Sequence, residues 1–237
     1  MAGRIETSTN ESPTKDCPRA PIWLRIAFVA VGLAAWFGSQ ALIGKRSFPD
    51  GTIGDAVHLW TAPLHDYLLE HPRAANALLI TSSAVVDLVG VSLLCLAIFG
   101  KSVRPFLGLL MLFILRQACE GLCSLPAPDE MIWHKTSVPT LLVTYGVSTD
   151  LFFSGHTGLA VLGAVELART KKRSLLLLGI AIALFEAATV LILRAHYTMD
   201  VFTGAVTALL VAQVAATIAP RCDAALARWS QTSHSSE

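Results

Sequence analysis

Two histidines and an aspartate in the C-terminal half of the chain have the residue types and spacing to perform chemistry. His156 lies in the segment Phe-Phe-Ser-Gly-His-Thr, and His196 is followed four residues later by Asp200. On a helix this spacing puts two side chains on one face, close enough for the carboxylate to orient the ring. One imidazole can then act as nucleophile or base and the other as general acid. Such a set suits displacement at a phosphate ester.

The composition places these groups in a membrane protein. Of the 237 residues, 54% are hydrophobic and 15% are charged, whereas soluble domains are about 25% charged. Ionisable side chains are expensive in lipid, so those that a membrane protein retains are functional by default. The formal net charge of +1 gives no indication of a nucleic-acid partner.

The hydropathy pattern predicts an all-α polytopic membrane protein, a six-transmembrane helical bundle. A helix needs about 20 apolar residues to cross the hydrocarbon core. Six runs qualify, at residues 22–43, 74–99, 106–125, 151–168, 175–193 and 200–219. The membrane domain is therefore expected to cover residues 22–219, with a disordered tail at 1–21 and a short solvated tail at 220–237.

Two long connections join these spans. Residues 44–73 include apolar and aromatic positions that are compatible with a short interfacial helix, and residues 126–150 contain three prolines and are expected to form an irregular loop. Trp133 and Tyr145 in the second connection are interpreted as packing or interface-anchoring residues. The sequence gives no role to the histidines of the two connections, which are His58, His65, His71 and His134.

The distribution of Lys and Arg predicts the orientation. Placing the N-terminus in the cytoplasm puts eleven of these residues in cytoplasmic segments and five on the other side, as the positive-inside rule requires. The run Lys171-Lys172-Arg173 is the strongest single signal. In this orientation both termini are cytoplasmic, and both histidine segments reach the non-cytoplasmic face.

The histidine segments resemble those of the type-2 phosphatidic acid phosphatase superfamily, whose active site has two histidines and an aspartate on a helical bundle. The chain departs from the phosphatase pattern in all three of its motifs. Phe153 stands where those enzymes have Pro, and Val190 stands where they have Arg. Their Lys-x6-Arg-Pro motif has only a shorter counterpart here, at residues 101–105.

A second branch is more similar, the sphingomyelin synthase and phosphatidylcholine:diacylglycerol cholinephosphotransferase group. Its members carry Phe-Ser-Gly-His and His-Tyr-Thr-(Ile/Met)-Asp, and both segments occur here, at residues 153–156 and 196–200. They also carry an Arg and a Cys in the preceding span, here Arg116 and Cys119, followed by a Leu-Pro-x-Pro turn, here at 125–128. The resemblance covers roughly residues 74–219.

This resemblance implies a phospholipid head-group transferase that needs no metal and no cofactor. His196 would attack the phosphorus of a phospholipid, and Asp200 would hold its ring in the right tautomer. His156 would protonate the departing alcohol. A phosphohistidine would form, and a second lipid alcohol, such as diacylglycerol or ceramide, would accept the phosphocholine-type group.

Several residues are candidates for binding the substrate phosphate. Ser154, Gly155 and the helix N-terminus near them are possible donors to the phosphoryl oxygens. Arg194, two residues before His196, is a candidate phosphate clamp by charge and position.

Four ionisable residues inside the predicted spans have two interpretations each. Arg116 and Glu120, four residues apart, form either a buried ion pair that fixes helix packing or a contact to the lipid phosphate and a choline-like cation. Asp87 and Glu186 are either hydrogen-bond partners between helices or part of an acidic lining that favours a quaternary ammonium group.

Two other functions remain open from the sequence. A lipid phosphate phosphatase would use the same residues with water as the acceptor. A non-catalytic lipid- or ion-handling membrane protein would use the acids and histidines as a relay, although the chain has no internal repeat of the kind that many transporters show. The head group, the acceptor, the compartment and the oligomeric state do not follow from the sequence.

Overall fold

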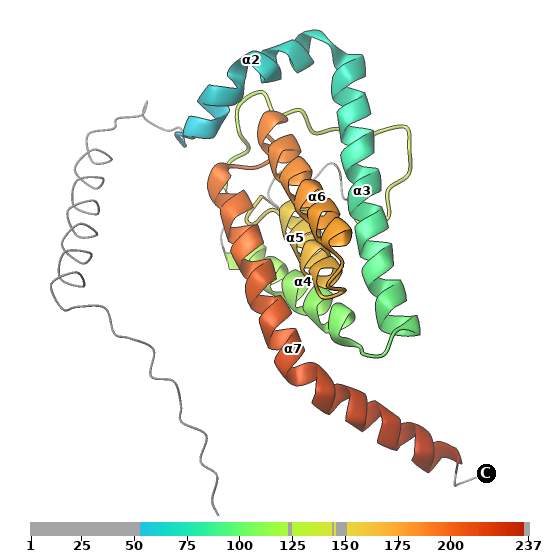
Figure 1. The fold of residues 1–237 in the computed structure, drawn as a ribbon. Coiled ribbons are helices and arrows are strands. Elements are labelled where there is room, and N and C mark those ends of the chain that lie inside the picture. The colour runs from blue at the N-terminus through green and yellow to red at the C-terminus, as the bar shows by residue number, and fades with distance from the viewer. Residues whose placement is uncertain (1–52, 123–124, 144, 146–150, 235–237) are drawn as a thin grey trace, which may run out of the picture. The chain divides into compact units, whose positions relative to one another are not determined.

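The computed structural model describes residues 53–122, 125–143, 145 and 151–234 (Figure 1). The polar tail at 1–21 and the first expected span at 22–43 lie outside the described residues. Within the described part every regular element is a helix, which confirms the all-α class. The helices are α2 (Ala56–Glu70), α3 (Pro72–Phe99), α4 (Arg104–Leu122), α5 (Gly155–Ala168), α6 (Arg173–Ile192) and α7 (Thr198–His234).

Four of the described helices are long and apolar enough to cross a membrane: α3, α4, α6 and the part of α7 up to Leu226. The helix in the fourth expected span, α5, has 14 residues and is about 21 Å long at 1.5 Å per residue, which is shorter than the hydrocarbon core. The described residues therefore show a membrane-embedded helical protein, and the count of six spans stays a prediction.

Two helix boundaries differ from the expected ones. We expected the fourth span to begin at residue 151, but α5 begins at Gly155 because the Ser154 hydroxyl caps it, accepting a hydrogen bond from the Thr157 N–H at 3.3 Å. We expected the last span to end at residue 219, but α7 continues through Pro220 to His234. The residues after Pro220 are rich in alanine, which favours continued helix, and this end of α7 extends away from the other helices (Figure 1).

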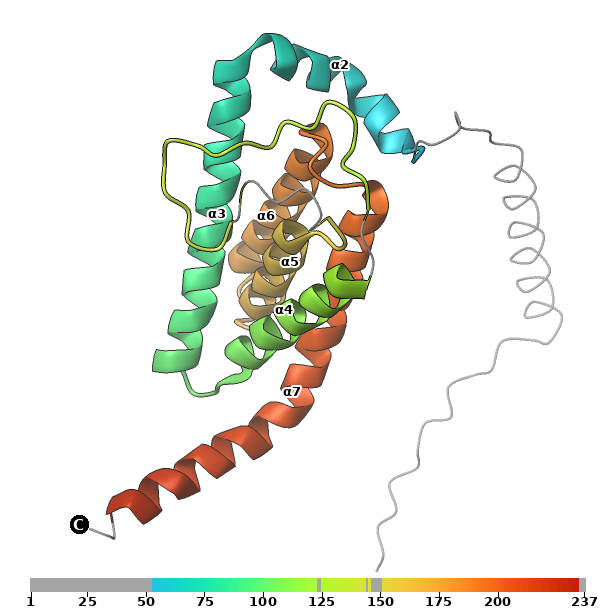
Figure 2. The same cartoon turned by 180° about the vertical axis from the view of Figure 1, so that it is seen from behind.

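The first connection contains the helix that we expected there. Asp55 caps α2, its carboxylate accepting hydrogen bonds from the N–H groups of Val57 and His58. The helix lies across one end of the bundle and packs against α3 and α6 (Figures 1 and 2).

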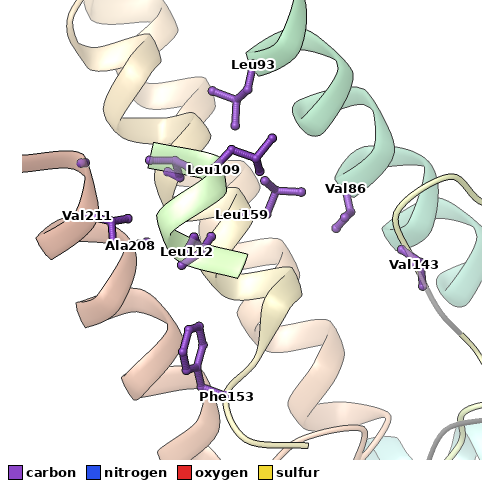
Figure 3. Close-up of a cluster of buried hydrophobic side chains, with 11 residues drawn as sticks. Val86, Leu93, Leu109, Leu112, Val143, Phe153, Leu159, Ala208 and Val211 are labelled. Carbon is purple, nitrogen blue, oxygen red and sulfur yellow. The ribbon is translucent and has the colours of Figure 1, made fainter. Parts of the chain in front are cut away.

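Helix α5 is the centre of the bundle and packs against α3, α4, α6 and α7. Buried side chains from these helices fill the space between them, with Phe153 at the start of α5 and Leu159 in its middle. Figure 3 shows how they converge. Many side chains on the outward faces are large, apolar and exposed, as expected of a surface that contacts lipid. Examples are Leu88, Ile98, Phe99, Leu184 and Phe202.

Glycines let α7 approach the start of α5. A Cβ built on Gly204 would lie 2.5 Å from the carbonyl oxygen of Ser154, and one on Gly158 would lie 3.4 Å from the carbonyl oxygen of Gly204. Small residues allow such approaches between membrane helices. The first turns of α5 and α7 therefore lie side by side.

The turns that carry Lys and Arg residues, between α3 and α4 and between α5 and α6, lie at the end of the bundle opposite α2. The Arg104 side chain donates to both carboxylate oxygens of Glu166, at 3.1 and 2.7 Å, and Arg169 lies 3.3 Å from the same carboxylate. Figure 1 shows the α3–α4 and α5–α6 turns together at this end. This arrangement is compatible with the predicted orientation, which the described residues do not themselves establish.

The close contact at Gly204 predicts that one added methyl group destabilises the folded protein. Gly204→Ala should lower the melting temperature in detergent by several degrees, because its Cβ meets a backbone carbonyl that cannot rotate away and overpacking costs about 1–3 kcal/mol. Gly121→Ala is the matched control, since among the described residues no atom outside its own helical turn lies within 4 Å of its Cβ position. Equal melting temperatures for the two variants would contradict this account of the α5–α7 contact.

Candidate active site

The first turn of α5 places His156. Ser154 is fully buried, and its N–H donates to the carbonyl oxygen of Asp200 at 3.1 Å, which ties the start of α5 to α7. Because the helix begins at Gly155, His156 lies in its first turn. Backbone N–H groups and the positive end of the helix dipole face outward at such a position and favour an anion.

The turn between α6 and α7 places the other two residues. Arg194 has a left-handed backbone (φ 53°), and the N–H groups of Ala195 and His196 both donate to the carbonyl oxygen of Val190. Asp200 lies in the first turn of α7 and accepts a hydrogen bond from the Tyr197 N–H at 2.8 Å. An acid that reaches back to the helix start in this way stabilises the N-terminus.

A backbone carbonyl sets the tautomer of His196. The Nδ1 atom lies 2.8 Å from the carbonyl oxygen of Leu151, and since a carbonyl only accepts, Nδ1 carries the proton. The Asp200 carboxylate lies 3.7 Å from the same nitrogen, too far for a hydrogen bond. The carbonyl group of Leu151 thus makes the hydrogen bond that we expected Asp200 to make. The Asp200 carboxylate contributes a negative charge near the ring. A neutral ring protonated at Nδ1 leaves the Nε2 lone pair for chemistry.

Both imidazoles line one buried cavity of about 50 Å³. Gly155, Arg116 and Trp133 line it too, and the other walls are mostly apolar. Within the described part of the chain, the buried Nε2 atom of His156 has no hydrogen-bond partner. The ring of Trp133 meets that of His156 edge-on, with centroids 5.2 Å apart.

Arg116 is the cation of this cavity. Its Nε donates to the carbonyl oxygen of Phe153 at 3.0 Å, and its Nη1 lies 2.6 Å from the Glu120 carboxylate. A Cβ on Gly155 would lie 3.2 Å from Nε, so the absence of a side chain there admits the guanidinium beside the helix start. The expected ion pair with Glu120 is present, although Glu120 itself does not line the cavity.

Arg194 lies elsewhere, although the sequence suggested it as the phosphate clamp. Its Nη1 donates to the carbonyl oxygen of Asp129 at 3.3 Å and to the Glu130 carboxylate at 3.2 Å. It is not among the residues that line the cavity. The structure therefore brings Arg116, and not Arg194, to the two histidines.

The two isolated acids also lie outside the cavity lining. Asp87 accepts hydrogen bonds from the N–H groups of Leu141 and Leu142, each at 2.8 Å. Glu186 accepts one from the hydroxyl of Ser82 on α3, at 2.5 Å. Both acids thus serve as hydrogen-bond partners between segments, the first of their two interpretations.

Sequence reasoning missed the role of α2 in holding the His196 turn. His58 donates from Nε2 to the carbonyl oxygen of His196 at 3.0 Å, and buried His65 donates from Nδ1 to that of Ile192 at 2.7 Å. The Asp55 carboxylate accepts from the N–H and hydroxyl of Thr198, at 2.6 and 2.8 Å. The seven-residue spacing of the two histidines, which puts them on one helix face, was the available signal.

The hydrogen bonds at Asp55 have an electrostatic consequence. Partial burial by itself would raise the pKa of its carboxyl, but the hydrogen bonds from Thr198 and the nearby His58 outweigh burial and hold the pKa below its usual value. Asp55 is therefore an anion that caps the starts of both α2 and α7.

A family model described as AtPDCT1/2 matches residues 54–217, which is more than half of the chain. Comparison with curated proteins gave no match, and comparison with solved structures gave none either. The matched residues include every helix that contributes to the cavity and all three residues of the histidine–aspartate set. The chain therefore belongs to the AtPDCT1/2 family, a phosphatidylcholine:diacylglycerol cholinephosphotransferase family.

Proposed function

We propose that this protein transfers phosphocholine from phosphatidylcholine to diacylglycerol, with His196 as the nucleophile. One observation carries the proposal: two imidazoles and a guanidinium line one cavity, and the hydrogen bond to Leu151 places a proton on Nδ1 of His196, which leaves Nε2 as the nucleophilic nitrogen of the neutral ring. A neutral imidazole nitrogen is a competent nucleophile toward phosphorus.

In the first half of the reaction, Nε2 of His196 attacks the phosphorus of phosphatidylcholine. A nitrogen–phosphorus bond forms, and the bond from phosphorus to the glycerol oxygen breaks. His156, which takes up a proton once the anionic phosphate lies beside it, gives that proton to the glycerol oxygen. Diacylglycerol leaves, and phosphocholine remains on His196. The Asp200 carboxylate, 3.7 Å from Nδ1, stabilises the positive charge that the ring acquires.

The second half reverses these steps with another diacylglycerol molecule. Neutral His156 takes the proton from its free hydroxyl, the alcohol oxygen attacks phosphorus, and the bond to His196 breaks. The leaving and accepting groups are chemically alike, so the same residues serve both directions. Ceramide carries a comparable hydroxyl and is the alternative acceptor.

Arg116 and the start of α5 supply the charge that this reaction needs. The guanidinium lies against the first turn of α5, so cationic and N–H donors converge where phosphoryl oxygens would gather charge. Both histidines are more than nine-tenths buried. Burial that limits water favours a lipid alcohol as acceptor over hydrolysis by a phosphatase.

The predicted topology completes the proposal. The site would face the non-cytoplasmic side, with both termini in the cytoplasm. Relationship to the sphingomyelin synthases and the type-2 phosphatidic acid phosphatases rests on the resemblance of the two histidine segments.

His196→Ala should reduce transfer to the background rate. Purified protein in liposomes, given phosphatidylcholine and fluorescent diacylglycerol, should form fluorescent phosphatidylcholine only with His196 present. Brief reaction with phosphatidylcholine labelled in its phosphate should leave label on the protein that survives base and is lost in acid, as a phosphohistidine requires. His134→Ala, an exposed histidine outside the cavity, is the matched control. Full transfer by His196→Ala would exclude this mechanism, and release of free phosphocholine by the parent would indicate water as acceptor.

The two arginines should differ in their effects. Arg116→Gln should lower kcat for transfer by about 100-fold, the usual effect of removing one donor to a charged transition state. Arg194→Gln should lower it much less, because its guanidinium is bound to Asp129 and Glu130. A larger loss of kcat in Arg194→Gln than in Arg116→Gln would mean that Arg194, and not Arg116, binds the phosphate.

Asp55 is expected to act as a positioning residue for His196. Asp55→Asn should lower kcat roughly tenfold with KM for both lipids unchanged, since loss of a cap costs about 1 kcal/mol and the turn it holds carries the nucleophile. Asp55→Glu, which keeps the anion, should recover part of the rate. Asp66→Asn, at an exposed acid on the same helix, is the control. A parallel loss in both Asn variants, or no rescue by Glu, would mean that α2 only contributes general stability.

A further inference from the structure

The catalytic cavity is too small for a lipid. At about 50 Å³ it has room for a few water-sized groups, whereas pockets for drug-sized ligands measure about 300–1,000 Å³. A phosphate group fits such a volume and acyl chains do not. If the proposed function holds, the chains of each lipid substrate lie on other surfaces that adjoin the cavity.

A groove of about 410 Å³ lies between the middle of α3 and residues 136–141 of the following connection. Ile80, Ala84, Leu88 and Val91 form its wall on the helix, and Val138 and Leu141 lie on the connection. The lining is mostly apolar. Because α3 is one of the candidate membrane spans, the groove lies at the depth of lipid chains.

One layer of residues separates this groove from the catalytic cavity. On α3, Val86 lines the cavity and Asp87 lines the groove; on the connection, Leu142 lines the cavity and Leu141 lines the groove. Gly90 lacks the side chain that would collide with Leu142, so the connection packs closely on the helix. A lipid in the groove thus lies one side-chain layer from the two histidines.

Side chains pair several backbone groups of the connection. Asp87 accepts the N–H groups of Leu141 and Leu142. The hydroxyl of Thr136 donates to the carbonyl oxygen of Val138, and that of Thr140 to the carbonyl oxygen of Val143. Leu141 is 67% exposed, so the connection holds its shape and presents an apolar side chain to the groove.

Charge decides which part of a lipid the groove can hold. Among the described residues that line the groove, Asp87 is the only ionisable one, and a carboxylate repels a phosphate. The cation that would attract phosphate, Arg116, lines the catalytic cavity instead. We propose that the groove between α3 and residues 136–141 holds an acyl chain of diacylglycerol, both as the free acceptor and as the diacylglycerol part of phosphatidylcholine, a proposal that rests on the transferase function.

A filling substitution tests the groove kinetically. Ala84→Phe should raise KM for diacylglycerol and KM for phosphatidylcholine, each roughly tenfold, equivalent to about 1.4 kcal/mol, because the diacylglycerol units of the two lipids use the groove in turn. Ala77→Phe is the matched control, two helical turns away on the same exposed face of α3. Unchanged kinetics in Ala84→Phe, or a rise in KM for phosphatidylcholine alone, would overturn the assignment.

A binding experiment separates this proposal from the transferase function. The full-length His196→Ala protein in liposomes would be irradiated with diacylglycerol that carries a diazirine on one acyl chain. The label should enter peptides that contain residues 80–91 and 136–141. Unlabelled diacylglycerol should compete with this labelling, and Ala84→Phe should reduce it. This result would support an acyl chain in the groove even if no transfer is ever seen. Labelling that diacylglycerol does not compete, or labelling no stronger than on other lipid-facing peptides, would assign the groove to bulk lipid and overturn the proposal.

Discussion

The hydrogen bond from the Ser154 N–H to the carbonyl oxygen of Asp200 is the contact on which the site depends. It joins the first turns of α5 and α7. Gly204 allows the approach, and the ring of His196 completes it by donating to Leu151. With these contacts the two imidazoles line one cavity; without them His156 and His196 belong to separate helix ends.

Helix α2 adds an outer layer of support. The turn between α6 and α7 leaves carbonyl and N–H groups without helical partners, and such groups need partners in an apolar setting. His58, His65 and Asp55 provide them from one helix. Polar residues that seem out of place in a membrane protein thus satisfy its backbone, and Asp87 does the same for residues 141 and 142.

Hydropathy predicted α3, α4, α6 and the start of α7 because spans of fixed length leave a strong signal. The two histidine segments predicted that His156 and His196 would lie at one site. The sequence offered both Arg194 and Arg116 for the substrate phosphate. It did not distinguish them, because proximity in sequence to His196 says nothing of side-chain direction, which the neighbouring acids decide. The contacts of Asp55 and His58 with the turn join residues about 140 positions apart, and no local pattern encodes such pairings. The start of α5 was predicted four residues too early because it is set by a single residue, the N-cap Ser154.

The hydrogen bond that orients His196 ends on a main-chain atom. Every amino acid at position 151 supplies the same carbonyl oxygen, so the side chain there is free to change while the tautomer of His196 stays fixed. A survey of side-chain replacements would register Leu151 as a packing residue and pass over its part in the chemistry. Only a change in the backbone itself, such as an ester in place of the peptide bond between residues 151 and 152, would weaken that acceptor.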